Sequence, residues 1–220
     1  MKVYPFSRFP PLFRDHQEAA SGKEKKGCLN DALFCNDAAF DWLYPEHFQL
    51  MSLKHWTPLA IARQAAAFLA TPGAKILDIG SGIGKFCLAG AYHFPDSYFC
   101  GVEQRHELVH YAQVAREYAG LSNVNFVHAN ITQVNFGAFD HFYFYNAFYE
   151  NIDPANSIDD SIELSVPLFN YYNQYLRSVL DKTPPGTRLV TYQSFEEEVP
   201  PGFCLSDTTC GGLMKMWIKE

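Results

Sequence analysis

Short apolar segments alternate with longer helical segments in this chain from about residue 74 onward. Each apolar segment has the length of one buried strand, and each segment between two of them is long enough for a crossover helix. Strands are expected over 74–79, 97–102, 124–128, 139–145 and 187–194, and helices over 84–94, 105–119 and about 159–180. The alternation predicts an α/β fold, a three-layer sandwich with helices on both faces of a mostly parallel sheet.

Two further apolar segments, 203–205 and 213–218, close the chain and are separated by Cys210-Gly211-Gly212. Glycines between two short apolar segments are typical of a hairpin, so we expect an antiparallel pair at the edge of the sheet.

The first third of the chain has a different pattern of apolar and polar residues. Residues 1–27 carry three prolines and the polar run 21–27, which predicts an arm and a flexible loop. Residues 29–70 have a helical pattern, clearest over 58–70, where Thr57 is expected to cap a helix that begins with Pro58. We therefore divide the chain into an N-terminal arm with a helical lid, 1–72, and a core domain, 73–220.

Composition limits the partners and the compartment. A net charge of -7 argues against a surface that neutralises many phosphates, so nucleic acid is an unlikely partner and a protein or small molecule is favoured. No apolar run reaches the roughly 20 residues of a membrane span, and no signal peptide is visible, which predicts a cytoplasmic protein without a membrane partner. The six cysteines form no C-x-x-C pair and are expected to be reduced.

A glycine-rich segment follows the first expected strand. That strand ends near Asp78, and Gly80, Gly82 and Gly84 come directly before a helix, so backbone amides should face a ligand there. The second strand ends at Glu103, 19 residues after Gly84, where a carboxylate can accept hydrogen bonds from both ribose hydroxyls. These features predict a nucleoside-containing cofactor. The G-x-G-x-x-G pattern of dinucleotide sites would need glycine at Lys85, which disfavours a nicotinamide oxidoreductase.

The glycine segment and the terminal hairpin together resemble the class I S-adenosylmethionine-dependent methyltransferases, over about residues 55–220. The resemblance implies a seven-stranded sheet whose last strand is antiparallel, with S-adenosyl-L-methionine as cofactor and no metal. It also implies how the cofactor is bound. The glycine loop would hold the methionine part, Glu103 at the end of the second strand would hold the ribose, and the residues after the third strand would flank the adenine. The matching residues are Asp78, Gly80, Ser81, Gly82, Gly84, Glu103, Gln104, Asn130 and Ile131. Thr57, ahead of the first strand, is expected to contact the carboxylate of the ligand.

Asn146-Ala147-Phe148-Tyr149 follows the fourth strand. It is similar to the strand-four motif of many N-methyltransferases and of the non-SET histone-lysine methyltransferases, although Ala147 and Phe148 replace the two prolines found in many of them. The resemblance implies a nitrogen acceptor on a protein or small molecule, oriented by Asn146. Phe148 would face the cofactor and Tyr149 would exclude water, which makes Asn146 and Tyr149 the candidate catalytic residues and adds Asn146 and Phe148 to the cofactor site. The alternative is that these aromatic side chains only cap the sheet.

Other interpretations stay open. The stretch His106-Glu107-Leu108-Val109-His110 is a formal H-E-x-x-H, but it falls inside a βαβ pattern and lacks the extended zinc-peptidase continuation, so surface histidines are favoured. The acidic runs 159–160 and 196–198 are expected to be solvated, or else to rim a pocket for a cationic substrate. A binding protein that retains the cofactor but not catalysis is the alternative function. The identity of the acceptor and the oligomeric state are not decided.

Overall fold

A computed structural model describes residues 31–220, so the predicted arm over 1–27 lies outside the described part. Seven strands form one sheet in the order β3-β2-β1-β4-β5-β7-β6. Their bounds are β1 Lys75–Ile79, β2 Tyr98–Glu103, β3 Val124–His128, β4 His141–Tyr145, β5 Arg188–Tyr192, β6 Phe203–Thr209 and β7 Met214–Lys219. β1 to β5 pair in parallel, whereas β7 is antiparallel to both β5 and β6. The predicted fold class, including the terminal antiparallel hairpin, is confirmed.

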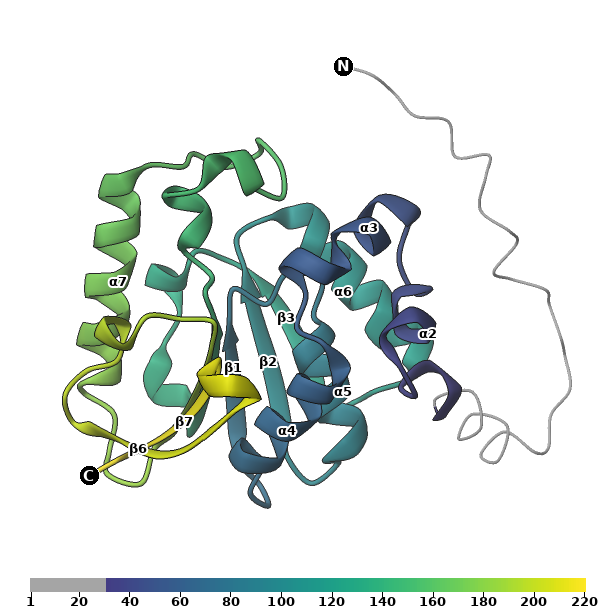
Figure 1. The fold of residues 1–220 in the computed structure, drawn as a ribbon. Helices are drawn as coiled ribbons and strands as arrows, with labels where there is room; N and C mark the ends of the chain where they lie inside the picture. Colours follow the sequence, from purple (N-terminus) through teal and green to yellow (C-terminus); the bar gives the residue numbers. More distant parts are fainter. Residues whose placement is uncertain (1–30) are drawn as a thin grey trace, which may run out of the picture.

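Helices cover both faces of the sheet (Figure 1). On one face lie α4 Leu59–Leu69, α5 Lys85–His93 and α6 His106–Ala119, whose apolar residues form one core cluster with the sheet. The other face packs against α7 Val166–Leu180 and the short 3-10 turns Ile131–Gln133 and Phe136–Ala138. None of the helices in residues 31–220 has the length and apolar character needed to span a membrane.

The long C-terminal helix is shorter than the sequence pattern predicts. α7 begins at Val166 rather than near residue 159, because the Ser165 hydroxyl accepts a hydrogen bond from the Leu168 amide and Pro167 occupies the first turn. Residues 157–165 instead form an irregular segment, in which Asp159 pairs with a buried arginine.

Two helices precede α4 and dock on the core. These are α2 Asp37–Asp41 and α3 Glu46–His55. Lys85, almost fully buried at the start of α5, forms ion pairs with Asp37 and Asp41 at 2.7 and 2.8 Å. The Tyr44 hydroxyl donates to the Ile83 carbonyl at 2.9 Å. Aromatic residues of this segment share one apolar cluster with α4, α5 and α6, so the N-terminal helices are packed continuously with the core.

The predicted cap at Thr57 is wrong. Pro58 is the N-cap position of α4, and the free amide of Leu59 donates to the Asp37 carboxylate at 2.9 Å. The Thr57 hydroxyl bonds instead to the Tyr143 hydroxyl at 3.0 Å, which ties the start of α4 to β4.

Candidate active site

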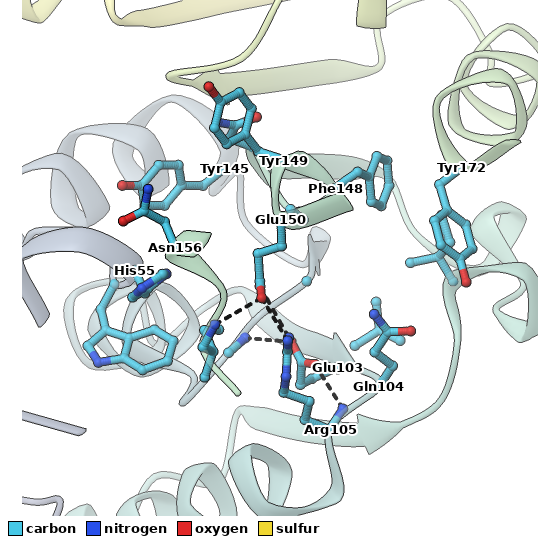
Figure 2. A pocket seen from close by; sticks show the side chains of 18 of the residues that line it. His55, Glu103, Gln104, Arg105, Tyr145, Phe148, Tyr149, Glu150, Asn156 and Tyr172 are labelled. Atoms are coloured by element: carbon cyan, nitrogen blue, oxygen red, sulfur yellow. Dashed lines mark hydrogen bonds and ion pairs between the residues drawn. The ribbon is translucent and has the colours of Figure 1, made fainter. Parts of the chain in front are cut away.

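A cavity of about 270 Å³ opens at the carboxyl ends of the central parallel strands. Its walls come from the β1–α5 loop, the end of β2, the segments after β3 and β4, and the end of α3 (Figure 2). A smaller inner cavity of about 30 Å³ adjoins it, and His55, Trp56, Gly80 and Tyr145 line both. Ligands of open parallel sheets bind at this edge, where strand order reverses on either side of β1.

The β1–α5 loop depends on glycine at two points of close approach. A Cβ on Gly80 would lie 2.4 Å from the Cβ of Ala147, and one on Gly82 would lie 2.7 Å from the Trp56 ring. Both glycines have positive φ, 75° and 53°. The loop therefore forms one wall of the cavity directly against the segment after β4. Gly84 lines neither cavity; it is the N-cap position of α5 and packs on Phe126.

Glu103 lies at the end of β2 and is only 6% exposed. Its carboxylate accepts hydrogen bonds from the Gly82 amide at 3.1 Å and the Arg105 amide at 2.9 Å (Figure 2). Burial raises the pKa of Glu103, and these amides with the Arg105 charge partly offset the effect. The carboxylate is thus fixed at the wall of the larger cavity, with further acceptor capacity for hydroxyl donors.

Asp78 lines the inner cavity and is 4% exposed. Within residues 31–220 it has no ion pair, and the Cys87 thiol donates to it at 3.5 Å. Burial raises the pKa of Asp78 to about 8. Next to it, the buried Ser81 hydroxyl has no hydrogen-bond partner in the described part of the chain. A buried carboxyl without a cationic partner and a buried hydroxyl without a hydrogen-bond partner fit a ligand that brings a cation and further polar groups.

Polar and aromatic side chains form the far end of the larger cavity. The Asn130 amide nitrogen donates to the Tyr172 hydroxyl at 2.8 Å and to the Gln104 side-chain oxygen at 3.4 Å. Phe148 packs on Tyr172 with ring centroids 5.5 Å apart, and Ile131 completes this wall. The residues expected around the adenine are therefore brought together here.

Asn146, the first residue after β4, has a strained backbone and a side-chain acceptor without a hydrogen-bond partner in the described chain. Its φ is 42°, in the left-handed region, and its backbone amide donates to the Ser194 hydroxyl at 3.1 Å. Its side-chain oxygen Oδ1 is buried and has no partner among residues 31–220, although Asn146 lines the cavity. Such an acceptor is costly unless a bound molecule supplies a donor.

Tyr149 is 38% exposed at the mouth of the cavity, with its ring centroid 6.3 Å from that of Phe195. Tyr149 therefore lines the cavity where the cavity opens to solvent.

Sequence reasoning missed a buried ion-pair network beside the cavity. Arg105 pairs with Glu150 at 2.7 Å (Figure 2). It also pairs with Asp159 at 2.8 Å. Arg105 follows Glu103 closely, but its partners are 45 and 54 residues away and could not be identified from spacing. Glu150 also accepts from the Ile158 amide at 3.0 Å, so this cluster holds the β4–α7 connection against the end of β2. Other lining residues that were missed are Lys54, Tyr145, Asn156, Tyr172 and Gln193.

The expectation of solvated acidic runs is wrong for two residues. Asp159 belongs to the Arg105 network, and Glu198 is buried, which raises its pKa to about 7. His106 and His110 are exposed on α6. Residues 31–220 contain no group of three His, Cys, Asp or Glu side chains that could hold a metal ion.

Sequence comparison identifies two relatives, both named tRNA (guanine-N(7)-)-methyltransferase and both from Synechococcus strains. The protein from strain JA-3-3Ab is 53% identical over 55 residues, which are 25% of this chain and 23% of the relative. The protein from strain JA-2-3B'a(2-13) is 51% identical over the same length. The matched segment thus spans less than a quarter of these relatives.

Solved structures share the fold at low sequence identity. TrmN from Thermus thermophilus has a TM-score of 0.55 and 22% identity, over 76% of this chain and 49% of its own. An RNA methyltransferase from Salinibacter ruber, in complex with S-adenosyl-L-homocysteine, has a TM-score of 0.52 and 18% identity, covering 74% and 91%. Magnesium protoporphyrin IX methyltransferase from Synechocystis PCC 6803, with bound SAM, has a TM-score of 0.52 and 15% identity, covering 92% and 100%.

The comparisons contradict the exclusion of nucleic acid. Proteins similar to this chain are named tRNA and RNA methyltransferases, so the net charge of -7 was the wrong criterion. Net charge averages over the whole chain and hides the distribution of charge along it. Residues 1–30 hold six of the 17 Lys and Arg residues but only three of the 24 Asp and Glu residues.

A family model described as a methyltransferase domain matches residues 70–212, which are most of the chain. The match includes the glycine loop, Glu103 and the segment after β4. The seven-stranded sheet with its antiparallel β7 agrees with the resemblance drawn from the sequence. The chain therefore belongs to the methyltransferase-domain family, with the fold of the class I S-adenosylmethionine-dependent enzymes.

Proposed function

We propose that this chain transfers the methyl group of S-adenosylmethionine to a nitrogen atom of a nucleobase in RNA. The observation that carries the proposal is the Asn146 Oδ1 atom, a buried acceptor without a partner in the described chain, on the cavity wall beside the glycine loop. An acceptor in that position favours a substrate that brings an N–H group into the cavity.

The residues present fit the cofactor. Asp78, buried without a cationic partner within residues 31–220, would hold the ammonium group of the methionine part, and Ser81 would offer its unpartnered hydroxyl. Glu103 would accept hydrogen bonds from the ribose hydroxyls, and the wall of Gln104, Asn130, Ile131 and Phe148 would flank the adenine. Thr57 lines the inner cavity near the methionine end. When bound, S-adenosylmethionine supplies an electrophilic methyl group on a sulfonium sulfur, which departs as a neutral thioether.

The protein's own residues position the acceptor nitrogen. Asn146 Oδ1 accepts a hydrogen bond from one N–H of an amino nitrogen, whose lone pair forms the new N–C bond while the proton of its second N–H leaves. His55 lines both cavities, and burial, with a contribution from nearby Lys54 and Arg105, lowers its pKa. A neutral imidazole is a suitable acceptor for the proton that the nitrogen releases. Trp56, Phe148 and Tyr149 exclude water around the reacting atoms.

RNA as the acceptor is supported by the two relatives, which are named tRNA methyltransferases, and by the structural neighbour from Salinibacter ruber, which is an RNA methyltransferase. The excess of basic residues within 1–30 adds a source of phosphate contacts, even though the remainder of the chain is strongly acidic. An RNA acceptor also agrees with the cytoplasmic location that the sequence predicts.

Asn146→Gly tests the proposal. Glycine adopts the φ of 42° without steric cost and removes the side chain with its carboxamide, so backbone strain does not confound the result. We expect methyl transfer to fall about 10- to 1000-fold, while the affinity for S-adenosylhomocysteine changes by less than about threefold, because only positioning of the acceptor is lost. The measurement is transfer of labelled methyl groups to transcribed tRNA and total RNA, paired with calorimetry.

Cys210→Gly is the matched control, since Cys210 is another non-glycine residue with positive φ but lies in the turn before β7, away from both cavities. Normal transfer by Asn146→Gly would refute the role of the carboxamide. Binding of S-adenosylhomocysteine without transfer to any RNA by the native protein would favour a cofactor-binding protein that is not a catalyst.

A further inference from the structure

A second strained amide residue stands beside Asn146. Gln193 directly follows β5, and its φ is 50°. Tyr145 and Tyr192 are register partners on parallel β4 and β5, so Asn146 and Gln193 are the next residues along neighbouring strands. Both line the larger cavity. They are two of the three non-glycine residues with positive φ in residues 31–220.

Burial of the side chain does not explain why a glutamine occupies this position. The Gln193 amide donates to the Leu213 carbonyl at 2.8 Å, which holds the backbone, but glycine would make the same bond without the strain of the left-handed region. The side chain of Gln193 is exposed, so burial of apolar surface does not offset the strain of the backbone. Strained positions that persist at a cavity wall point to a use for the side chain at that cavity.

Tyr145 orients the Gln193 carboxamide. The Tyr145 hydroxyl has one hydrogen, which it shares between the Lys54 carbonyl at 3.2 Å and the Gln193 Oε1 atom at 3.4 Å. With its oxygen engaged, Gln193 presents the two hydrogens of its nitrogen Nε2 as donors. Asn146 presents a bare acceptor, Oδ1. The ends of β4 and β5 therefore offer a hydrogen-bond acceptor and a donor side by side.

The Watson–Crick edges of adenine and cytosine have the complementary pattern, an amino group beside a ring nitrogen that accepts a hydrogen bond. We propose that Gln193 determines which base is methylated: its Nε2 donates to the acceptor atom next to the methylated nitrogen, while Asn146 accepts the N–H of that nitrogen. Tyr149 and Phe195, 38% and 48% exposed beside this position, offer aromatic surface on which the base stacks. This assignment rests on the proposed methyl transfer to RNA.

The test compares RNA that has adenine or cytosine at the methylated position with the same RNA containing 1-deazaadenine or 3-deazacytosine, analogues that keep the amino group but lack the neighbouring ring nitrogen. The native protein is expected to prefer the natural base about 10- to 100-fold in kcat/KM, because the analogue leaves a donor without its partner. Gln193→Met keeps the length of the side chain but removes the donor, so the preference should shrink to within about threefold. S-adenosylhomocysteine affinity should not change.

Gln174→Met, at an exposed position on α7 outside both cavities, is the matched control and should retain the native preference. Tyr145→Phe gives an independent check, since the Gln193 amide loses the hydroxyl that orients it, and an intermediate preference is expected. A Gln193→Met protein that discriminates as well as the native protein would overturn the assignment while methyl transfer to RNA stands. A native protein that binds S-adenosylhomocysteine but methylates no RNA would overturn the proposed function and this assignment together.

Discussion

Asp78 shows, at the scale of single residues, how the fold prepares a site for a charged ligand. Asp78 is the second-last residue of β1, in register with Gly101 of β2 and Tyr143 of β4. Its carboxyl is buried, and none of the described basic side chains pairs with it. Burial therefore raises its pKa to about 8, and it holds a proton at neutral pH. A ligand ammonium would favour the ionised form.

We expect the affinity for S-adenosylhomocysteine to rise as the pH increases from about 6 to about 8 and then to level off. Below about pH 8 the free carboxyl is protonated, so binding of the ammonium must release that proton, and the affinity gains at most about tenfold per pH unit. In Asp78→Asn the affinity should depend less on pH and should be lower at every pH. Calorimetry at several pH values measures the affinity of both proteins. An identical slope in the native and variant proteins would contradict the assigned role of Asp78.

The limits of sequence reasoning are clearest at this scale. Asp78, Gly80, Gly82 and Glu103 line the cavities because their positions follow from strand ends and a glycine loop, both of which are local in sequence. Gln193 could not be identified in the same way, since its significance comes from the β4–β5 register and from a backbone angle. The assignment of individual residues to cofactor contacts remains a prediction.

At the scale of elements, the connection from β4 to α7 is the part that the sequence predicted least well. The sequence pattern placed Asp159 at the start of a helix and in a solvated acidic run and predicted nothing for Glu150, whereas both bind Arg105, whose side chain is 4% exposed. The helical periodicity of α7 was visible, but the start of the helix depends on the cap at Ser165 and on a distant arginine. Interactions between segments override a local pattern in such cases.

We expect Arg105→Ala to lower the free energy of unfolding by about 3 kcal/mol, because it leaves two partly buried carboxylates without their partner. The Arg105 backbone amide, which donates to Glu103, is retained in the variant. Lys215→Ala is the matched control: it breaks a more exposed pair with Glu196 and should cost less than about 1 kcal/mol. Urea unfolding gives both values, and equal losses would show that the Arg105 network does not stabilise the connection.

At the scale of the whole molecule, the N-terminal helices and the sheet form one packed body. Phe40, Tyr44 and Trp56 lie in the same apolar cluster as α4, α5 and α6, and Lys85 joins α2 to α5. The division at residue 72 is therefore proposed as a division of roles: the first part closes the cavity, and the second supplies the loop, the acid and the strand ends. The fold class could be predicted from the alternation of apolar and helical segments. The class of partner could not be predicted from the net charge of the chain.

The most direct test of this account is a calorimetric titration of the full chain with S-adenosylhomocysteine, comparing the native protein with Glu103→Gln and with Glu107→Gln, an exposed residue on α6 outside both cavities. We predict one micromolar site per chain, weakened by about 1–3 kcal/mol in Glu103→Gln through loss of charge-assisted hydrogen bonds and unchanged in Glu107→Gln. Absence of binding to the native protein, or equal affinity in Glu103→Gln, would contradict the assignment of this cavity as the cofactor site.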